Sequence, residues 1–220
     1  MITLHNVSFS YEENKPFFYQ TNLTLSPSKT TVVLGKNGSG KTTLFQLISD
    51  ILTPDFGEIQ KQQDVLFIPD TPMLYEYLTG YEYLDYIKIL SRDALSETIH
   101  HYIKQFDLSE HMGKLIHEMS LGMKHKLALL SGVLLNYQVY LIDEPLTALD
   151  PPAQKDMIAL FKYLANEGKT LILSTHMMSI AYEIADELVV LTSQNPLIIE
   201  NTFESYQAFE TAILPHFEST

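Results

Sequence analysis

One short segment constrains the fold of this chain more than any other. Residues 35–42 read Gly-Lys-Asn-Gly-Ser-Gly-Lys-Thr, which fits the G-x-x-x-x-G-K-[ST] pattern of a loop that holds nucleotide phosphates. Its glycines let backbone N–H groups turn toward one anion, Lys41 supplies a positive charge, and the Thr42 hydroxyl is a ligand type that suits Mg²⁺. The segment therefore predicts that the protein binds a nucleoside triphosphate.

The residues on either side of this loop support the same prediction. The β-branched run Thr30–Leu34 predicts a buried strand, and Thr42–Ile51 has apolar residues at helical spacing. A loop that joins a strand to a helix receives the partial positive charge of the helix N-terminus, which favours a bound anion. A flexible glycine loop with an incidental lysine is the alternative, and both flanks argue against it.

Composition and charge exclude several classes of protein. The chain has 220 residues, of which 45% are hydrophobic, enough for one sizeable core or one core with a smaller subdomain. Its net charge of -13 repels nucleic-acid backbones and anionic lipid heads, so we expect no nucleic-acid partner. The absence of cysteine excludes disulfides and thiolate metal sites and fits a reducing cytosol.

We expect neither a signal peptide nor a direct membrane span. The N-terminus, Met1 to Asn6, lacks a basic region followed by an apolar stretch. The most apolar window, Leu127 to Ile142, contains four polar or small residues and falls short of about 20 uninterrupted apolar residues. This window predicts a buried helix followed by a buried strand.

Periodicity predicts an α/β protein with alternating strands and helices. Two strands around a turn with Asn14 and Pro16 open the chain, and a helical insert follows Pro72. The predicted strands are Ile2–Phe9, Thr21–Leu25, Thr30–Leu34, Val65–Ile68, Val139–Ile142, Thr170–Ser174 and Glu187–Leu191. The predicted helices are Thr42–Ile51, Tyr81–Leu90, Ala94–Phe106, Ser120–Leu135, Pro151–Asn166 and one after His176.

The predicted fold is a phosphate-loop NTPase with a mainly parallel sheet. An antiparallel β-subdomain forms its N-terminal part, and a helical subdomain of about residues 72–135 is inserted. We find no repeat, low-complexity tract or linker, so residues 1–220 are predicted to form a single domain. Residues 201–220 carry no motif that we can interpret.

Two adjacent carboxylates form the second constellation. Asp143 and Glu144 follow the apolar run Val139–Ile142, and such a strand end lies at the edge where parallel sheets bind ligands. Asp143 is placed to hold Mg²⁺ through water, and Glu144 to orient and deprotonate an attacking water. A solvated strand end with a helix cap is the alternative for these residues taken alone.

A histidine follows a third strand. His176 comes after Leu173-Ser174-Thr175 and is predicted to donate a hydrogen bond to the γ-phosphate, although a single histidine in such a place is more often structural. The remaining histidines of this part of the chain lack metal-ligand spacing with carboxylate support, and we interpret them as ordinary surface or hydrogen-bonded residues. These are His100, His101, His111, His117 and His125.

Taken in order, these motifs resemble the nucleotide-binding subunit of an ATP-binding cassette (ABC) transporter over nearly the full length of the chain. Met119-Ser120-Leu121-Gly122-Met123 stands where this family has its signature Leu-Ser-Gly-Gly-Gln. Ala148-Leu149-Asp150 matches the loop after the second carboxylate motif, and Tyr11 matches the aromatic residue that stacks on adenine. Because the signature acts on a nucleotide held by a second subunit, one copy cannot complete its own site.

The resemblance implies a head-to-tail pair that sandwiches two ATP molecules with Mg²⁺. The partners implied are a second ATP-binding subunit, identical or different, and a separate transmembrane permease, which would place this chain on the cytoplasmic face of the membrane. The implied catalytic residues are Glu144, His176 and Lys41, and the implied metal ligands are Thr42, Asp143 and Asp70. The implied ATP-binding residues are Tyr11, Gly35, Lys36, Asn37, Gly38, Ser39, Gly40, Lys41, Thr42 and Thr43, with Ser120, Gly122 and Asp150 acting in trans.

The chain departs from the family pattern at three positions. Leu121 replaces the first signature glycine and Met123 replaces glutamine, while Asp70 stands where the family has glutamine after the Val65–Ile68 strand. An aspartate is shorter and charged, so we hypothesise that Asp70 approaches Mg²⁺ and couples metal binding to the partner. These departures are similar to those of bacterial export-type cassettes.

The segment Pro72–Leu78 is followed by Tyr81, Tyr83 and Tyr86 and is rich in aromatic residues. In the resembling family this region receives a short helix of the membrane subunit, and aromatic side chains often anchor interfaces. Burial in the core of the helical subdomain is the alternative, chiefly for Leu84 and Ile87.

Other functions remain as alternatives. A soluble ABC ATPase of ribosomes or DNA would need a basic surface, and such proteins generally contain two cassettes. A GTPase would need an Asn-Lys-x-Asp motif and a nucleotide kinase a lid with arginines, whereas Arg92 is the only arginine here. A role in binding without hydrolysis is compatible with the altered signature.

Overall fold

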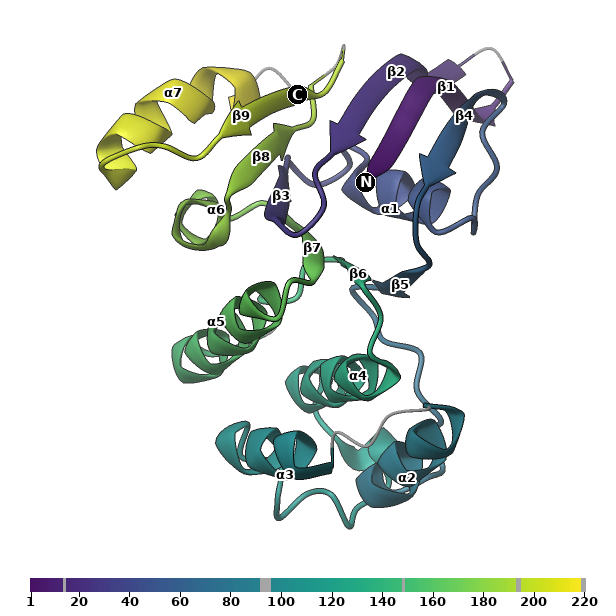
Figure 1. Ribbon diagram of the computed structural model, residues 1–220, viewed down its shortest axis with the longest axis vertical. Coiled ribbons are helices and arrows are strands. Elements are labelled where there is room, and N and C mark those ends of the chain that lie inside the picture. Colours follow the sequence, from purple (N-terminus) through teal and green to yellow (C-terminus); the bar gives the residue numbers. More distant parts are fainter. Residues whose placement is uncertain (14, 92–95, 148, 193–194, 219–220) are drawn as a thin grey trace.

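A six-stranded, mainly parallel sheet runs through the centre of the protein (Figure 1). The computed structural model describes all residues except 14, 92–95, 148, 193–194 and 219–220. Five strands run parallel and lie side by side in the order β5-β6-β7-β3-β8. At one edge, β9 pairs antiparallel with β8. The strands are β3 Thr30–Leu34, β5 Val65–Ile68, β6 Val139–Ile142, β7 Thr170–Thr175, β8 Glu187–Val190 and β9 Leu197–Glu200.

Both faces of this sheet are covered, which explains why its strands are apolar runs rather than alternating ones. In β3 every residue is buried, and its side chains alternate between two cores. Val33 packs with helix α1, Lys41–Ile48, and with the N-terminal strands, whereas Val32 and Leu34 pack with the core on the opposite face. The predicted mainly parallel sheet is confirmed.

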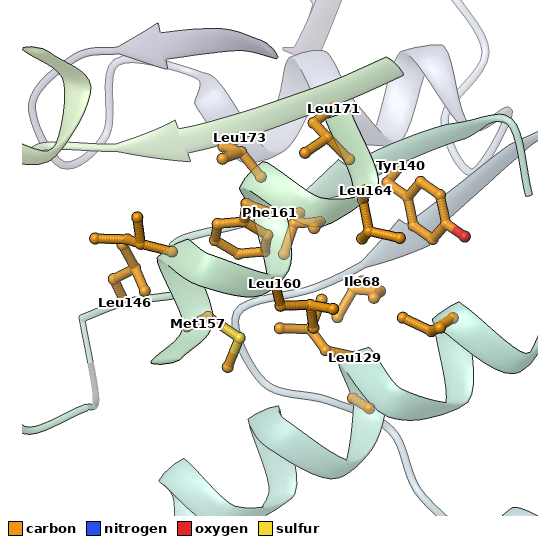
Figure 2. Close-up of a cluster of buried hydrophobic side chains, with 14 of the residues drawn as sticks. Ile68, Leu129, Tyr140, Leu146, Met157, Leu160, Phe161, Leu164, Leu171 and Leu173 are labelled. Atoms are coloured by element: carbon orange, nitrogen blue, oxygen red, sulfur yellow. The ribbon is translucent and has the colours of Figure 1, made fainter. Parts of the chain in front are cut away.

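The core on that opposite face is formed by helix α5, Pro151–Asn166, and helix α4, Leu121–Leu135, which both pack on the sheet (Figure 2). Met157, Leu160, Phe161 and Leu164 recur at helical spacing, so they form one apolar face of α5. Asp150 caps this helix by accepting a hydrogen bond from the Ala153 N–H at 2.9 Å, and prolines occupy the first turn, where no N–H is needed. The predicted bounds of this helix are confirmed.

A separate antiparallel sheet, β2-β1-β4, packs over α1 and confirms the predicted N-terminal β-structure (Figure 1). The turn was predicted to contain Pro16, which is wrong: Pro16 lies in β2, opposite Ser10 of β1. Proline is tolerated there because β2 is an edge strand with one unpaired side. Asn14 of the same turn lies outside the described residues. The strands are β1 Ile2–Glu12, β2 Lys15–Leu25 and β4 Phe56–Lys61.

Strand β4 was not predicted, because its sequence lacks the alternation of apolar and polar residues that indicates a strand. It contains Gly57, and only Ile59 and Lys61 are partly buried, so no clear alternation is visible. Gly57 has a φ of 84° and approaches the carbonyls of His5 and Asn6 so closely that a Cβ would lie 2.4 Å from each. Helix α1 also ends at Ile48 rather than Ile51, and Asp50 adopts a left-handed φ of 61°.

Three helices gather at the end of the molecule away from the N-terminal sheet (Figure 1). The start of α2 is set by a capping box in which Thr79 and Glu82 exchange hydrogen bonds, and Ser120 caps α4 by accepting from the Met123 N–H. The predicted window Leu127–Ile142 is confirmed as the end of α4 followed by β6. Ala94, the predicted start of a helix, lies outside the described residues. The elements are α2 Gly80–Leu90, α3 Ser96–Gln105, the 3-10 helix η1 Ile116–Glu118 and α4 Leu121–Leu135.

Residues 206–218, within the tail in which the sequence shows no motif, form a helix. Helix α7, Tyr206–Glu218, buries Phe209 and Ile213, and Phe209 contacts Tyr182 of helix α6, Met178–Ile184. This helix was not predicted, because it contains Pro215, and proline removes a helical hydrogen bond and is rare in helix interiors. Across the part of the chain that the structure describes, no helix is both long and apolar enough to cross a membrane.

We predict that Phe161→Ala lowers the free energy of unfolding by about 3–5 kcal/mol, because it leaves a cavity in the core between α5 and the sheet. Phe161 is only 1% exposed, whereas Phe56, at 76%, provides a matched control. Phe56→Ala should change stability by less than about 0.5 kcal/mol. Urea denaturation measures both, and equal losses in the two variants would contradict this account of the core.

Candidate active site at the carboxyl edge of the sheet

Three motifs far apart in the sequence meet at one edge of the sheet. Strand β7 pairs with β6 on one side and β3 on the other, all parallel, so their carboxyl ends lie together. The phosphate loop follows β3, Asp143 and Glu144 follow β6, and His176 follows β7. A cavity of about 390 Å³ opens at this edge, lined by Phe17, Asn37, Gly38, Gly40, Lys41, Thr42, Thr43, Asp70, Asp143 and Glu144.

The phosphate loop lines this cavity with two glycines in a left-handed conformation. Gly38 and Gly40 have φ values of 84° and 103°, which other residues rarely adopt. No side chain caps the N-terminus of α1 and no acidic residue lies in its first turn, so no side chain of the helix competes with an anion there. This is the arrangement that binds a phosphate group.

Lys41 is buried, and its ammonium group is held inside the site. Its Nζ donates to the carbonyls of Gly35 at 2.8 Å and Lys36 at 3.1 Å, and it forms an ion pair with Glu144 Oε1 at 3.1 Å. The two carbonyls fix the direction of the side chain. Glu144 thus occupies the place where a phosphate oxygen would meet the lysine.

Asp143 is 1% exposed and is surrounded by hydroxyl groups. Its Oδ2 accepts from Thr42 Oγ1 at 2.5 Å, and its Oδ1 accepts a short hydrogen bond from Ser174 Oγ. Burial raises the pKa of the Asp143 carboxyl despite these hydrogen bonds, and the neighbouring charges of Glu144 and Asp70 raise it further. A cation beside Asp143 would relieve this cost of burying its charge.

Glu144 lies at the centre of the polar network. Burial alone would raise its pKa, but the hydrogen bond from Thr147 at 2.8 Å and the Lys41 charge outweigh burial and hold the pKa below its usual value. His176 Nδ1 lies 3.1 and 3.2 Å from the two carboxylate oxygens and assists. The carboxylate is therefore ionised at neutral pH and able to accept a proton.

Ser174 is a candidate site residue that the sequence did not indicate. Its hydroxyl donates to Asp143 and accepts from the Glu144 backbone N–H at 2.9 Å, so one side chain holds both carboxylate residues in place. It also helps to hold Glu144 at a φ of 47°, which is unusual for a residue other than glycine. The available signal was a serine inside the buried strand β7, whose hydroxyl needs a partner.

The structure separates Tyr11 from the cavity lining. Tyr11 is exposed, its hydroxyl lies 2.9 Å from Thr43 Oγ1, and its ring meets Phe17 edge to face at 5.6 Å. Phe17, which the sequence reasoning did not select, lines the cavity directly and covers Gly40. The aromatic surface beside the phosphate loop thus comes from β1 and β2 together.

The signature residues lie in a different cavity, of about 400 Å³. This cavity is lined by Asp150, at the start of α5, and by the signature residues Ser120, Leu121, Gly122 and Met123. Ser120 and Asp150 cap the neighbouring helices α4 and α5. None of these residues lines the cavity of the phosphate loop. Ala148 of the predicted motif lies outside the described residues.

Asp70 is exposed and lines the phosphate-loop cavity, close enough to Asp143 to affect its pKa. His125, predicted to be an ordinary surface or hydrogen-bonded residue, is buried rather than on the surface. A sequence cannot show this, because burial depends on how α4 packs. No cluster of three or more His, Cys, Asp or Glu residues in the described part of the chain is placed to hold a metal ion by itself.

The region expected to contact a membrane subunit divides between core and surface. Tyr83 is buried and donates to Ser131 at 3.4 Å, and Leu84 and Ile87 are buried with it. Tyr81 and Tyr86 on the same helix are exposed. Of the two interpretations of this aromatic segment, burial in the core therefore applies to Tyr83. The exposed side chains of Tyr81 and Tyr86 fit a role in an interface.

We predict that Thr147→Val lowers the free energy of unfolding by about 1 kcal/mol at pH 7, because a hydrogen bond to a partly exposed carboxylate is lost. The pKa of Glu144 is lowered, so this contribution is present above the pKa of the unfolded state, about 4.3, and disappears as the pH falls through the folded pKa. The loss should therefore become smaller as the pH falls from 7 to 3.

Thr211→Val is the matched control, because the Thr211 hydroxyl donates to the Gln207 carbonyl at 2.8 Å and to no carboxylate. Its effect on stability should not change between pH 7 and pH 3. Chemical denaturation across this pH range measures both variants, and a loss at Thr147 that is independent of pH would contradict the assigned pKa.

Comparisons with known proteins agree with this geometry. The family model described as "ABC transporter" matches residues 18–147. The chain is 26% identical to the ABC-type transporter ATP-binding protein EcsA of Bacillus subtilis, over 87% of this chain and 83% of that protein. It is 29% identical to the energy-coupling factor transporter ATP-binding protein EcfA1 of Fusobacterium nucleatum, over 88% of this chain and 79% of that protein.

A solved structure extends the likeness to the fold. The dimeric post-hydrolysis state of the ATP-binding cassette MJ0796, bound to ADP and Pi, superposes with a TM-score of 0.80. The likeness covers 92% of this chain and 100% of the other, at 20% sequence identity. Because the family model covers more than half of the chain, the chain belongs to the ABC transporter family and is, as its sequence predicts, an ATPase of that family.

Proposed function

We propose that this chain is the ATP-hydrolysing subunit of a membrane transporter and works as one half of a head-to-tail pair. The division of functional residues between two cavities supports this proposal most directly. The cavity of the phosphate loop holds Lys41 and Glu144, whereas Ser120 and Asp150 line the other. In a head-to-tail pair, the second cavity of each subunit would close over the nucleotide of its partner.

Hydrolysis would begin with an exchange of partners at Lys41. The lysine is paired with Glu144, and the γ-phosphate of ATP would take over that ion pair. Glu144 is then free to accept a proton from the attacking water, while the N–H at His176 Nδ1 keeps its carboxylate oriented. Donation from His176 to the γ-phosphate at the same time would require a proton on both ring nitrogens. The glycine N–H groups and Lys41 stabilise the charge that develops on the phosphate oxygens.

Mg²⁺ fits the oxygen ligands of this site. Thr42 and Asp143 are already within hydrogen-bond distance of each other, and Asp70 faces the same cavity. These three residues would hold the ion together with phosphate oxygens and water, as Mg²⁺ prefers few protein ligands. The ion would neutralise charge on the β- and γ-phosphates.

A groove beside Asp70 is the proposed docking site of the transmembrane permease. It has a volume of about 170 Å³ between β5, α2 and α4 and is lined mainly by apolar residues. Met73 of its wall is 91% exposed, and Tyr75 and Tyr77 add exposed aromatic surface nearby. A short amphipathic helix of the permease would bury these side chains and hold the subunit on the cytoplasmic face of the membrane.

We also propose that residues 72–135 act as a helical subdomain that moves as the pair closes, within a single ATP-binding domain of residues 1–220. The direction of transport that we propose is export, on the similarity of Asp70 and the altered signature to export-type cassettes. ATP-dependent movement of substrate into inside-out vesicles of cells that contain the transporter would test the direction.

We predict that Glu144→Gln lowers the rate of ATP hydrolysis roughly a thousandfold, as expected for loss of a general base, while ATP still binds. The unreacted ATP should then hold the protein as a dimer, which size-exclusion chromatography with Mg-ATP detects. Glu167→Gln, at an exposed position at the end of α5, should change neither property. Unaltered turnover in Glu144→Gln would exclude Glu144 as the base.

A mixing experiment tests whether the site is shared between subunits. Lys41→Ala and Ser120→Ala should each be inactive alone, because each removes one side of both composite sites. In a mixture, a mixed dimer contains one intact site, so part of the ATPase activity should return. Activity that stays at zero, under conditions where the two variants form mixed dimers, would contradict a composite site in a homodimer.

A further inference from the structure

The short helix that follows His176 is held at its C-terminus by a side chain from a later part of the chain. Helix α6, Met178–Ile184, has only two turns, and the last four carbonyl groups of a helix have no partner within it. Asn201, which follows β9, donates from Nδ2 to the carbonyls of Tyr182 at 3.0 Å and Ala185 at 2.8 Å. One amide group therefore caps two carbonyls at the end of α6.

The backbone of Asn201 is itself fixed on the central sheet. Its N–H donates to the Asp186 carbonyl at 2.9 Å. Asp186 exchanges two hydrogen bonds with Thr30 at the start of β3: its N–H donates to the Thr30 carbonyl at 2.8 Å, and its Oδ2 accepts from the Thr30 N–H at 2.7 Å. Strand β3 leads into the phosphate loop. Asn201 thus ties the end of α6 to the strand that carries this loop.

Aromatic packing supports the same end of the helix. The Tyr182 ring meets the rings of Tyr206 and Phe209 of α7, with centroids 5.8 and 5.4 Å away. Figure 1 shows α7 beside α6, and the two helices are in contact. A helix of two turns is marginal by itself in water, so α6 depends on these contacts and on its cap for its position.

His176 lies between two elements whose positions are fixed. Strand β7 ends at Thr175 and α6 begins at Met178. The His176 side chain is 38% exposed, and its Nδ1 lies 3.1 and 3.2 Å from the carboxylate oxygens of Glu144. Because packing around the ring is incomplete, the place of the imidazole depends largely on the backbone to either side. The orientation of α6 is therefore one of the two constraints on the contact with Glu144.

The amide of asparagine is particularly suited to this cap. It presents two N–H donors on one nitrogen, and both find a carbonyl of α6. Aspartate has nearly the same shape but no donor when ionised. It would also bring a negative charge to the negative end of the helix dipole. An exchange of Asn201 for aspartate would thus release the end of α6 without a change in side-chain size.

We propose that Asn201 is a positioning residue for hydrolysis, which holds α6 so that His176 meets the Glu144 carboxylate. This inference rests on the proposed function, in which His176 orients the base. Asn201 lines neither the cavity of the phosphate loop nor that of the signature, and it acts through α6.

Asn201→Asp in the full chain should lower kcat for ATP roughly 10-fold, a scale expected when a group that acts on the reactants is slightly misplaced. KM should stay unchanged, because both cavities keep their residues. Asn22→Asp is the matched control, since Asn22 Nδ2 donates to the Gln20 carbonyl at 2.9 Å and to Asn6 Oδ1 at 3.1 Å in the N-terminal sheet. It loses the same donors and gains the same charge, and its kcat should equal that of the unmodified chain.

A double-mutant cycle with His176 supplies a readout that a purely structural role would not move. His176→Ala should itself lower kcat, and its residual turnover is measured at high protein concentration. In that background, Asn201→Asp should have no further effect on kcat, because the side chain through which Asn201 acts is absent. The two losses should therefore be non-additive.

The outcomes separate this inference from the proposed function. An unchanged kcat in His176→Ala would overturn the role of His176 in the proposed function, and the inference with it. With a slow His176→Ala, full activity of Asn201→Asp or additive losses in the double variant would overturn the role of Asn201 alone, as would an equal loss of kcat in Asn22→Asp. Should Asn201→Asp fail to fold, the same cycle with Asn201→Ser, whose hydroxyl donates one hydrogen bond in place of two, decides by the same criterion.

Discussion

Parallel pairing of β7 between β6 and β3 is the constraint on which the rest of the structure depends. It aligns Ile142 with Leu173 and Leu34 with Thr175, so the residues after each strand meet at one edge. Ser174 then joins the two carboxylate residues through one hydroxyl, which accepts from the Glu144 N–H and donates to Asp143. Any slip of this register would separate the phosphate loop from Asp143, Glu144 and His176, which follow the neighbouring strands.

Lys41 and Glu144 form an ion pair that a bound ATP molecule would rearrange. Lys41 and Glu144 neutralise each other in a largely buried position, and the carbonyl groups of the loop hold the lysine so that it need not move far. Burying the two charges as a pair costs less free energy than burying either charge without its partner. In the proposed function, a bound γ-phosphate would replace the Glu144 carboxylate as the partner of Lys41, so ATP itself would release the proposed base.

Much of the fold could be predicted because its signals are local. Helix α5 has its cap, its prolines and its apolar face in one continuous segment, and β3 and β6 are short apolar runs that end at turn signals. Strand β4 and helix α7 lack such signals, since one carries Gly57 and the other Pro215, and both form because they pack on other elements. The roles of Ser174 and Phe17 also depend on partners distant in the chain, so no local pattern marked them.

By itself, the sequence determined the family and the candidate site residues: the phosphate loop, Asp143, Glu144, His176 and the signature are identifiable because each needs particular residue types at fixed spacing. Only the tertiary structure decided which of these residues share a site. Ser120 meets Asp150 in a cavity that excludes the phosphate loop, and Asp70 joins Asp143 and Glu144 in the other cavity, because helix packing and parallel strand order bring distant segments together. Such contacts depend on the geometry of several elements at once, which no single stretch of sequence encodes.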